Sequence, residues 1–499
     1  MKKWKWMHKW FSVVAGLLLL LWAFSGIVLN HRKIVSAVDV PRTWLPPNYT
    51  PENWNLASIR SALPYGDGWL VWGNIGIWQT DSSFRQWRPL MDGLPAGMDN
   101  RRTMRIIRTS GDLLLAATQS GLFMQSADGL WQQIALPLQD ERMMDVSEAE
   151  GKVYVVSRSD IFMATSAEIP LNFERLLLPA ASDEDGKTSL FRTLWVLHSG
   201  EVLGIAGKLV VDIFGLLLIF FVITGYIYFF FPGLIRLIRK RGMRATGLIN
   251  TNRFSIRWHN KLGLWLGGFL VFTALTGMFL RPPLLIPIAQ YRVTKLKGTI
   301  LNHPNTWHDK LRALRYDAVA GYYLIATNEG LYYSHHLASE APKPFTVQPP
   351  ISVMGINVLE MLENGNWLIG SFNGLYEWNP STGLLADYLT GEPQLQRPDV
   401  SSPISNNMIS GIIRKEKADL IFDYNRGLMH ADLNMPDILS AQPMPLWNLA
   451  LEIHTGRIFQ HYIGPFYLLL VPLTGLIALL ILISGIVVYI SMLIKKRSK

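Results

Sequence analysis

The sequence contains no cysteine, and this absence excludes several kinds of site at once. Disulfides, thiolate zinc sites, cysteine-held iron–sulfur clusters and haem attached through thioethers all require thiols. A cofactor held by histidine alone remains compatible with the composition.

Motifs that bind nucleotides or carry out hydrolysis are also missing. The chain has no GxGxxG, P-loop, GxSxG or HExxH sequence, so no flavin, nicotinamide, nucleotide or metalloprotease site is recognisable. We assign no catalytic residue and expect no nucleic-acid partner. Any electrons that the protein handles would come from a quinol or from a partner protein.

Acidic residues are outnumbered by basic ones, 37 to 47, and the net charge is +10. The 499-residue chain is 49% hydrophobic, with a mean hydropathy of +0.18, which is more apolar than an ordinary soluble protein. Four apolar runs are long enough to cross a bilayer, which takes about 20 residues. The lipid bilayer is therefore an expected partner, and well over half of the chain is left for water-exposed domains.

The apolar runs form a duplicated set of histidine-led stretches. From His8 to Gly26 is 18 residues, and from His259 to Gly277 is also 18 residues. A second pair of stretches begins near His198 and near His454, and each ends in a long apolar run. The pattern predicts two parallel repeats, each with an outward helix, a large insert and an inward helix.

Basic residues set the expected orientation. The segment 233–257 contains seven Arg and Lys residues and no acidic residue, and the C-terminal tail is basic as well. The positive-inside rule places this segment and both termini on the cytoplasmic side of the membrane and the two inserts on the outer side. The basic N-terminus also fits a secretory signal peptide, but its match to the third span argues against a cleaved leader.

Both inserts repeat one pattern: an apolar strand, a small turn, then Gly, an aliphatic residue and usually an aromatic one. The six copies lie at 69–78, 113–123, 153–162, 322–333, 367–378 and 420–430. Their turn residues, expected to have positive φ, are Gly76, Gly121, Asp160, Gly330, Gly374 and Gly427. Their spacing within each insert, 39 to 53 residues, is typical of propeller blades. We expect one six-bladed propeller with three blades from each insert. Two separate half-sheets are the alternative, which would leave strand edges exposed.

The expected fold is a duplicated four-helix transmembrane bundle with an outer all-β domain. The expected segments are transmembrane helices at 1–31, 193–232, 258–281 and 450–494, outer β inserts at 32–192 and 282–449, a basic cytoplasmic loop at 233–257 and a cytoplasmic tail at 495–499.

Six of the 11 histidines lie at or near the membrane helices. They are His8, His31, His198, His259, His454 and His461. The topology sorts them into an inner layer, His8 and His259, and an outer layer with the other four. A single histidine near a helix end is usually an interfacial polar residue, but a duplicated set is typical of axial ligands of haem iron in a helix bundle. We expect two haem b groups, one near each membrane face.

Glycines in the spans would give a porphyrin room against the backbone. They are Gly16, Gly204, Gly207, Gly263, Gly267, Gly268 and Gly464. Close helix packing through small residues is the alternative explanation. Asp212, an acid inside an apolar run, is expected to pair with a basic residue at the outer boundary. Proton release from a quinol is its alternative role.

The four spans resemble the PepSY-associated transmembrane family, also called iron-regulated membrane proteins. The residues that carry the resemblance are His8-Lys9-Trp10 and Ser25-Gly26, Leu197-His198 with Gly204, Gly207 and Thr224-Gly225, His259 with Gly263 and Thr276-Gly277, and His454 with Gly464 and Ser484-Gly485. The resemblance implies an inner-membrane haem b protein that reduces ferric siderophores in the periplasm. It implies His8 and His259 as inner ligands, and outer ligands from among His198, His454, His461 and His31.

The expected function is therefore a haem-dependent ferric (siderophore) reductase, which moves electrons across the membrane to a periplasmic siderophore or haem in iron uptake. The alternative is a non-redox, membrane-anchored propeller that binds or assembles with a periplasmic or outer-membrane uptake system. Blade-like repeats stand where family members usually carry PepSY domains, so the outer substrate stays open. His198 to Gly225 is 27 residues whereas His454 to Gly485 is 31, so spacing does not decide between His454 and His461.

Overall fold

A computed structural model of the chain describes residues 2–137, 142–352, 354–394, 407–416 and 418–497. The chain divides into two compact units, and each unit takes segments from both halves of the sequence. The helical unit contains residues 1–35, 186–302 and 447–499, and the β unit contains residues 36–185 and 303–446.

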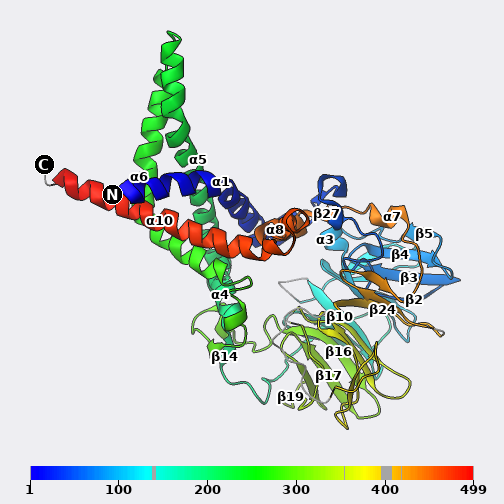
Figure 1. Cartoon of the computed structure of the whole chain (residues 1–499). Coiled ribbons are helices and arrows are strands. Elements are labelled where there is room, and N and C mark those ends of the chain that lie inside the picture. Colours follow the sequence, from blue (N-terminus) through cyan, green and yellow to red (C-terminus); the bar gives the residue numbers. More distant parts are fainter. Residues whose placement is uncertain (1, 138–141, 353, 395–406, 417, 498–499) are drawn as a thin grey trace. The chain divides into compact units, whose positions relative to one another are not determined.

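Four long helices build the helical unit (Figure 1). They are α1 (Lys2–Asn30), α5 (Gly204–Lys240), α6 (Thr246–Met278) and α10 (Tyr467–Arg497), and each belongs to a segment long and apolar enough to cross a membrane. α1 and α6 each pack against both α5 and α10, so α1 and α6 stand diagonally opposite each other. Small side chains such as Ala15 and Ala478 are buried between the helices, which allows close approach.

Short helices precede two of the long ones. α4 (Leu190–Ser199) and the 3-10 turn η3 (Glu201–Leu203) come before α5. α8 (Leu446–His454), η6 (Arg457–Phe459), α9 (Gln460–Ile463) and η7 (Gly464–Phe466) come before α10. The histidine-led stretches that start at His198 and His454 are therefore broken, where the sequence suggested continuous helices.

Glycines cause these breaks. Gly200 and Gly456 follow the short helices with φ values of 78° and 73°, and Gly204 and Gly464 introduce the long segments with φ values of 63° and 56°. Residues with a side chain rarely adopt such values, so these positions end a helix. Gly200 and Gly204 are four positions apart, whereas Gly456 and Gly464 are eight apart. The stretch from His454 to Gly485 is four residues longer than the equivalent stretch from His198 to Gly225, and the four extra residues lie between the turns at Gly456 and Gly464.

The basic segment 233–257, expected as a loop, is mostly helical. α5 continues to Lys240, α6 begins at Thr246, and only residues 241–245 between them are non-helical. Leucine, isoleucine, arginine and lysine fill the end of α5, and these residues are compatible with a helix. The smaller elements of the helical unit are α2 (Arg32–Val35), η4 (Ile286–Ile288), η5 (Ile300–Asn302) and the pair β14 (Lys187–Ser189) and β15 (Arg292–Thr294).

Within the described residues, the β unit contains six antiparallel sheets of three or four consecutive strands. The first sheet contains β2 (Ser61–Tyr65), β3 (Gly68–Gly73), β4 (Gly76–Asp81) and β5 (Trp87–Pro89), and the second contains β6 (Thr103–Arg108), β7 (Leu114–Thr118), β8 (Gly121–Gln125) and β9 (Trp131–Ile134). The third contains β10 (Met143–Ala149), β11 (Lys152–Ser157), β12 (Ile161–Ala164) and β13 (Phe173–Leu176), and the fourth contains β16 (Leu311–Asp317), β17 (Tyr322–Thr327), β18 (Leu331–Ser334) and β19 (Lys343–Pro344). The fifth contains β20 (Ile356–Met361), β21 (Trp367–Ser371), β22 (Gly374–Trp378) and β23 (Leu385–Asp387), and the sixth contains β24 (Ile409–Ile413), β25 (Leu420–Asp423) and β26 (Gly427–Met429). The unit also contains η1 (Arg42–Trp44), η2 (Pro47–Tyr49), α3 (Met98–Arg101), α7 (Asp437–Ser440) and the pair β1 (Asp39–Val40) and β27 (Met444–Pro445).

The second and third strands of every sheet form the hairpin that the sequence repeat predicts. In two of them, Val71 pairs with Trp78 and Ile369 pairs with Tyr376. Each of the five expected turn glycines has a positive φ, as tight hairpin turns require. The prediction of positive φ at Asp160 is wrong. Its carboxylate instead accepts a hydrogen bond from Arg175 Nε at 2.9 Å.

Five of the six sheets share one irregularity in their first strand. In β6, β10, β16, β20 and β24, the register with the second strand shifts by one residue. The extra residues are Met104, Met144, Arg312, Asn357 and Ser410. A bulge of this kind re-aims a side chain and increases the local twist. Its recurrence at one place in the strand shows that the sheets are structural repeats of one another.

The two inserts form one compact unit together. One hydrophobic core combines Trp54 from the first insert with Phe422 from the second. The segment before β2 also reaches the last sheet, because Leu428 N donates to Asn53 O at 2.8 Å. The first insert therefore adds backbone hydrogen bonds to the three-stranded sheet of the second insert.

Replacing Gly427 at this junction with alanine is expected to lower the melting temperature of the β unit strongly. A Cβ at Gly427 would lie 1.6 Å from Asn53 O, and the residue has a φ of 80°. The left-handed backbone costs about 1–2 kcal/mol, and the overlap adds about 1–3 kcal/mol. Gly321→Ala is the matched control, because Gly321 has a φ of 73° and open space at its Cβ position. Thermal unfolding of both variants is monitored by tryptophan fluorescence. Equal melting temperatures would contradict this account of the junction.

Candidate functional site

Two histidines face each other across one end of the helical bundle. His8 on α1 and His259 on α6 have ring centres 6.1 Å apart, with an angle of 81° between the ring planes. Nδ1 of His8 lies 2.9 Å from Ile481 O on α10, and Nδ1 of His259 lies 2.8 Å from Thr224 Oγ1 on α5. We call these two residues the inner pair.

A second pair repeats this arrangement at the other end of the bundle. His198 at the end of α4 and His454 at the end of α8 have ring centres 6.0 Å apart, with an angle of 50° between the ring planes. Nδ1 of His198 lies 3.0 Å from Thr273 O on α6, and Nδ1 of His454 lies 3.1 Å from Trp22 O on α1. We call these residues the outer pair. Each of the four imidazoles is thus anchored by a helix other than its own.

A serine or threonine hydroxyl lies beside each Nδ1 atom, at 2.8 to 3.5 Å. The hydroxyls are Ser484 for His8, Thr224 for His259, Thr276 for His198 and Ser25 for His454. Each hydroxyl donates its own proton to a carbonyl of its own helix, so towards the imidazole it acts as an acceptor. The proton of each neutral imidazole is therefore on Nδ1, and the lone pair is on Nε2.

The glycine that follows each of these hydroxyl residues lies against the same imidazole. A Cβ built on Gly277 would lie 2.5 Å from Cε1 of His198. The corresponding distances to the facing Cε1 are 2.9 Å at Gly485, 3.1 Å at Gly26 and 3.8 Å at Gly225. At Gly277, Gly485 and Gly26 the absence of a side chain thus lets the ring sit close to the helix. These four Ser/Thr-Gly pairs are visible in the sequence, but their contact with the imidazoles was not predicted. Their presence in all four spans was the signal.

The two pairs lie at different depths in the bundle. His8 and Ser25, which anchors the outer pair, are 17 positions apart on α1. His259 and Thr276 are also 17 positions apart on α6. At 1.5 Å per residue the separation along each helix is about 26 Å. This is close to the hydrocarbon thickness of a bilayer, about 30 Å.

The other two candidate histidines lie elsewhere in the helical unit. His31 Nε2 is 2.7 Å from Asp212 Oδ2, and Asn30 Nδ2 donates to the second carboxylate oxygen at 2.8 Å. This contact confirms that Asp212 pairs with a basic residue. His461 on α9 is exposed and packs edge-on against Tyr462, with ring centres 5.2 Å apart. The structure therefore brings His454, not His461, to His198.

The glycines expected to make room for a porphyrin have different surroundings. A Cβ on Gly16 would meet Tyr226 Oη at 2.4 Å, and one on Gly207 would meet a backbone carbonyl at 2.0 Å, so both serve close packing. Gly263 and Gly268 have open space at their Cβ positions. The others are Gly204 and Gly464 at the turns described above, and Gly267, which faces Ile486.

The spacing within each pair fits a metal ion held between two imidazoles. Metal–nitrogen bonds of about 2.1 Å on both sides would place the ring centres roughly 6 to 6.5 Å apart, and the observed values are 6.1 Å and 6.0 Å. Among the described residues, no group of three or more His, Cys, Asp or Glu side chains is placed to hold a metal. Each pair therefore offers two imidazoles at a spacing that one metal ion could bridge.

The four apolar helices make this chain a membrane protein that carries an all-β unit. The chain belongs to the PepSY-associated TM region family, whose sequence model matches residues 1–231 and 232–491. The two matches divide the chain into the two repeats, and they confirm the resemblance drawn from the sequence. No curated protein matches the chain.

Solved structures resemble the chain at low identity. The extracellular domain of a one-component system from B. thetaiotaomicron is 9% identical with a TM-score of 0.36, over 80% of this chain and 44% of that one. A streptogramin B lyase is 9% identical with a TM-score of 0.35, over 79% of this chain and 89% of that one. PorZ, a surface component of the type-IX secretion system of Porphyromonas gingivalis, is 10% identical with a TM-score of 0.33, over 78% of this chain and 40% of that one. The chain spans less than half of the first and third of these proteins, and TM-scores this low carry no argument about function.

Proposed function

We propose that this protein is a haem b protein of a bacterial inner membrane, which moves electrons across the membrane to reduce a periplasmic ferric ligand, a siderophore or haem, in iron uptake. The observation that carries the proposal is the presence of two facing histidine pairs, one at each end of a membrane-spanning bundle. His8 and His259 would hold the inner haem, and His198 and His454 would hold the outer one.

The chain's own residues prepare the histidines for this role. The backbone carbonyls and hydroxyls at each Nδ1 fix the tautomer and the orientation of the ring, which leaves the Nε2 lone pair for a metal. Orientation by partners of this kind also makes the imidazole a stronger ligand. Bound haem supplies reversible one-electron chemistry at its iron.

The depth of the two pairs supports transfer across the membrane. Along α1 and α6 the pairs are about 26 Å apart, so two haems would lie near the two faces of a hydrocarbon layer about 30 Å thick. Seven basic residues in 233–257 and a basic C-terminus support a topology with both termini in the cytoplasm and both inserts in the periplasm. The electron donor in this proposal is a membrane quinol.

The six sheets of the β unit form a six-bladed propeller in this proposal. Hydrogen bonds between neighbouring first strands support a ring: Leu314 N of β16 donates to Asp145 of β10 at 3.0 Å, and Asn357 Nδ2 of β20 donates to Ile409 O of β24 at 2.9 Å. Ile412 N of β24 donates to the carbonyl of Arg60, just before β2, at 2.8 Å. The last contact links the final sheet to the first, as closure of a ring requires.

A spectrum and a turnover assay test the function. Protein purified in detergent and reduced with dithionite is expected to show Soret and α bands of b-type haem, with two haems per chain. In proteoliposomes with a quinol, a ferric siderophore or a ferric chelate supplied on the periplasmic face is expected to reoxidise the haem and yield Fe(II). Protein with no haem after growth in haem-replete medium would overturn the proposal and favour a non-redox, membrane-anchored binding module. If the protein contains haem but reduces no ferric ligand, only the proposed substrate would be wrong.

A further inference from the structure

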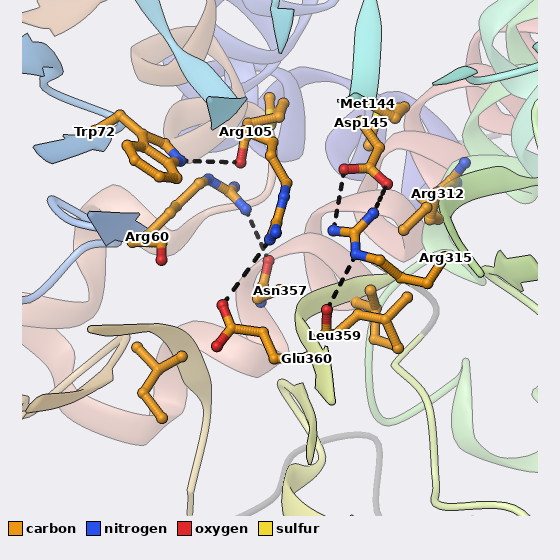
Figure 2. Close-up of a pocket in the computed structure, with 15 residues that line it drawn as sticks. Arg60, Trp72, Arg105, Met144, Asp145, Arg312, Arg315, Asn357, Leu359 and Glu360 are labelled. Carbon is orange, nitrogen blue, oxygen red and sulfur yellow. Dashed lines mark hydrogen bonds and ion pairs between the residues drawn. The ribbon is translucent and has the colours of Figure 1, made fainter. Parts of the chain in front are cut away.

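The first strands of all six sheets surround one cavity in the β unit. Its lining includes residues of β2, β6, β10, β16, β20 and β24 (Figure 2). The cavity is small, with a volume of about 40 Å3. Four of the five bulge residues belong to the lining: Met104, Met144, Arg312 and Asn357. The repeated bulge thus places its extra side chains at this cavity.

The cavity has an excess of positive charge. Its charged lining residues are Arg60, Arg105, Arg312, Arg315, Asp145 and Glu360, so four positive and two negative groups leave a net charge of +2. Asp145 is only 2% exposed and pairs with Arg315 through both carboxylate oxygens. Because that pair is neutral, Glu360 is the one carboxylate of the lining left to balance the other three arginines.

Arg60 and Arg105 have buried donors that are left without a partner. Within the described residues, the Nε atoms of both side chains are buried and make no hydrogen bond. Arg60 donates through one terminal nitrogen to Asn357 Oδ1 at 2.9 Å. The distance from a terminal nitrogen of Arg105 to Glu360 Oε1 is 3.9 Å, and this distance is too long for a hydrogen bond. Figure 2 shows both side chains at the cavity, with Arg60 reaching Asn357 and Arg105 directed towards Glu360.

Both arginines stay charged at neutral pH in spite of their surroundings. Burial lowers the pKa of Arg60 to about 9, and the charge of Arg102 adds to this effect. Burial lowers the pKa of Arg105 to about 10, and Arg315 contributes in the same direction. Within the described residues, each of these buried charges keeps an Nε donor without a hydrogen-bond partner, which is costly, so an anion at this place would stabilise them.

We propose that this cavity binds a small oxyanion through carboxylate or phosphate oxygens, with Arg60 and Arg105 as its main ligands. Guanidinium groups are planar and present paired N–H donors that match both kinds of anion. The apolar side chains of Trp72, Met104 and Met144 also line the cavity, and they lower the effective dielectric around the charges, which strengthens such contacts. This site lies within the β unit and does not depend on haem.

Calorimetric titration of the full chain in detergent tests the site, with citrate and inorganic phosphate as probes at constant ionic strength. We expect at least one of the two to bind, and the stronger binder identifies the class of oxyanion. Arg60→Gln and Arg105→Gln are each expected to weaken binding about tenfold or more, because each removes a charge-assisted hydrogen bond. Absence of binding of both anions to the unmodified protein would overturn the proposal.

Arg108→Gln is the matched control. Arg108 lies on β6 like Arg105, but its side chain is 42% exposed and pairs with Asp112, so binding is expected to be unchanged. If Arg105→Gln and Arg108→Gln bind the anion with equal affinity, the proposed anion site would be wrong.

Glu360→Gln gives a test that does not depend on the stability of the arginine variants. It removes a negative charge from the lining, so the anion is expected to bind about threefold to tenfold more tightly. Unchanged or weaker binding would contradict the proposal. Haem content measured on the same samples separates this site from the electron-transfer function, because the anion site can fail while both haems are retained.

Discussion

Replacing His259 with alanine is expected to reduce the haem content from two per chain to one. His259 reaches across the bundle towards His8, with ring centres 6.1 Å apart, and the structure offers no other histidine to that position in the described residues of the bundle. A b-type haem held by two axial imidazoles loses half of its axial ligands when one is removed. His198→Ala is expected to have the same effect on the outer haem. The pyridine haemochrome content of the purified variants gives the measurement, and the double variant should contain no haem.

His31→Ala and His461→Ala are the controls for this experiment. Nε2 of His31 already contacts Asp212 Oδ2 at 2.7 Å, and His461 lies on the exposed α9 beside Tyr462. Both variants are expected to retain two haems. A loss of haem in His461→Ala with no loss in His454→Ala would show that the outer pair is assigned to the wrong histidine. A full spectrum in both His198→Ala and His259→Ala would contradict the two sites together.

Gly277→Ala is expected to remove the outer haem although it changes no ligand. The new Cβ would lie 2.5 Å from Cε1 of His198, far inside van der Waals contact, so the imidazole must move. Because Nδ1 of His198 is held by Thr273 O at 3.0 Å, moving the ring is expected to break this hydrogen bond and to change the spacing from His454, now 6.0 Å between ring centres. The expected result is one haem per chain, with the inner haem unchanged.

The equivalent position in the inner pair supplies a matched control. At Gly225 the built Cβ lies 3.8 Å from Cε1 of His259, which is ordinary contact, so Gly225→Ala is expected to keep both haems. At Gly485 the built Cβ lies 2.9 Å from Cε1 of His8, so Gly485→Ala is expected to weaken binding of the inner haem. Haem loss that does not follow this order of distances would show that the glycines do not act through the imidazoles.

Much of the fold follows from patterns that are local in the sequence. The four membrane helices follow from apolar runs of sufficient length, and each of the six hairpins follows from one short repeated motif. The spacing of His8 and His259 in equivalent spans places them in one layer. These predictions succeed because each rests on one helix or one hairpin, whose geometry is fixed by nearby residues.

Contacts between helices could not be predicted in the same way. The choice between His454 and His461 depends on where the four extra residues of the second repeat are inserted, and only the turns at Gly456 and Gly464 reveal this. The hydroxyl and glycine that hold each imidazole come from a different helix, so their pairing depends on which helices are neighbours. The charged lining of the cavity combines Arg60, just before β2, with Arg105 of β6 and Glu360 of β20, and no single motif contains all three.

The anchoring of the four imidazoles crosses between the repeats. His8 belongs to the first repeat and is held by Ile481 of the second, while His259 of the second is held by Thr224 of the first. The outer pair follows the same rule. Neither half of the chain can therefore assemble even one complete site by itself. A half-length chain of this kind would need a second copy to complete either histidine pair.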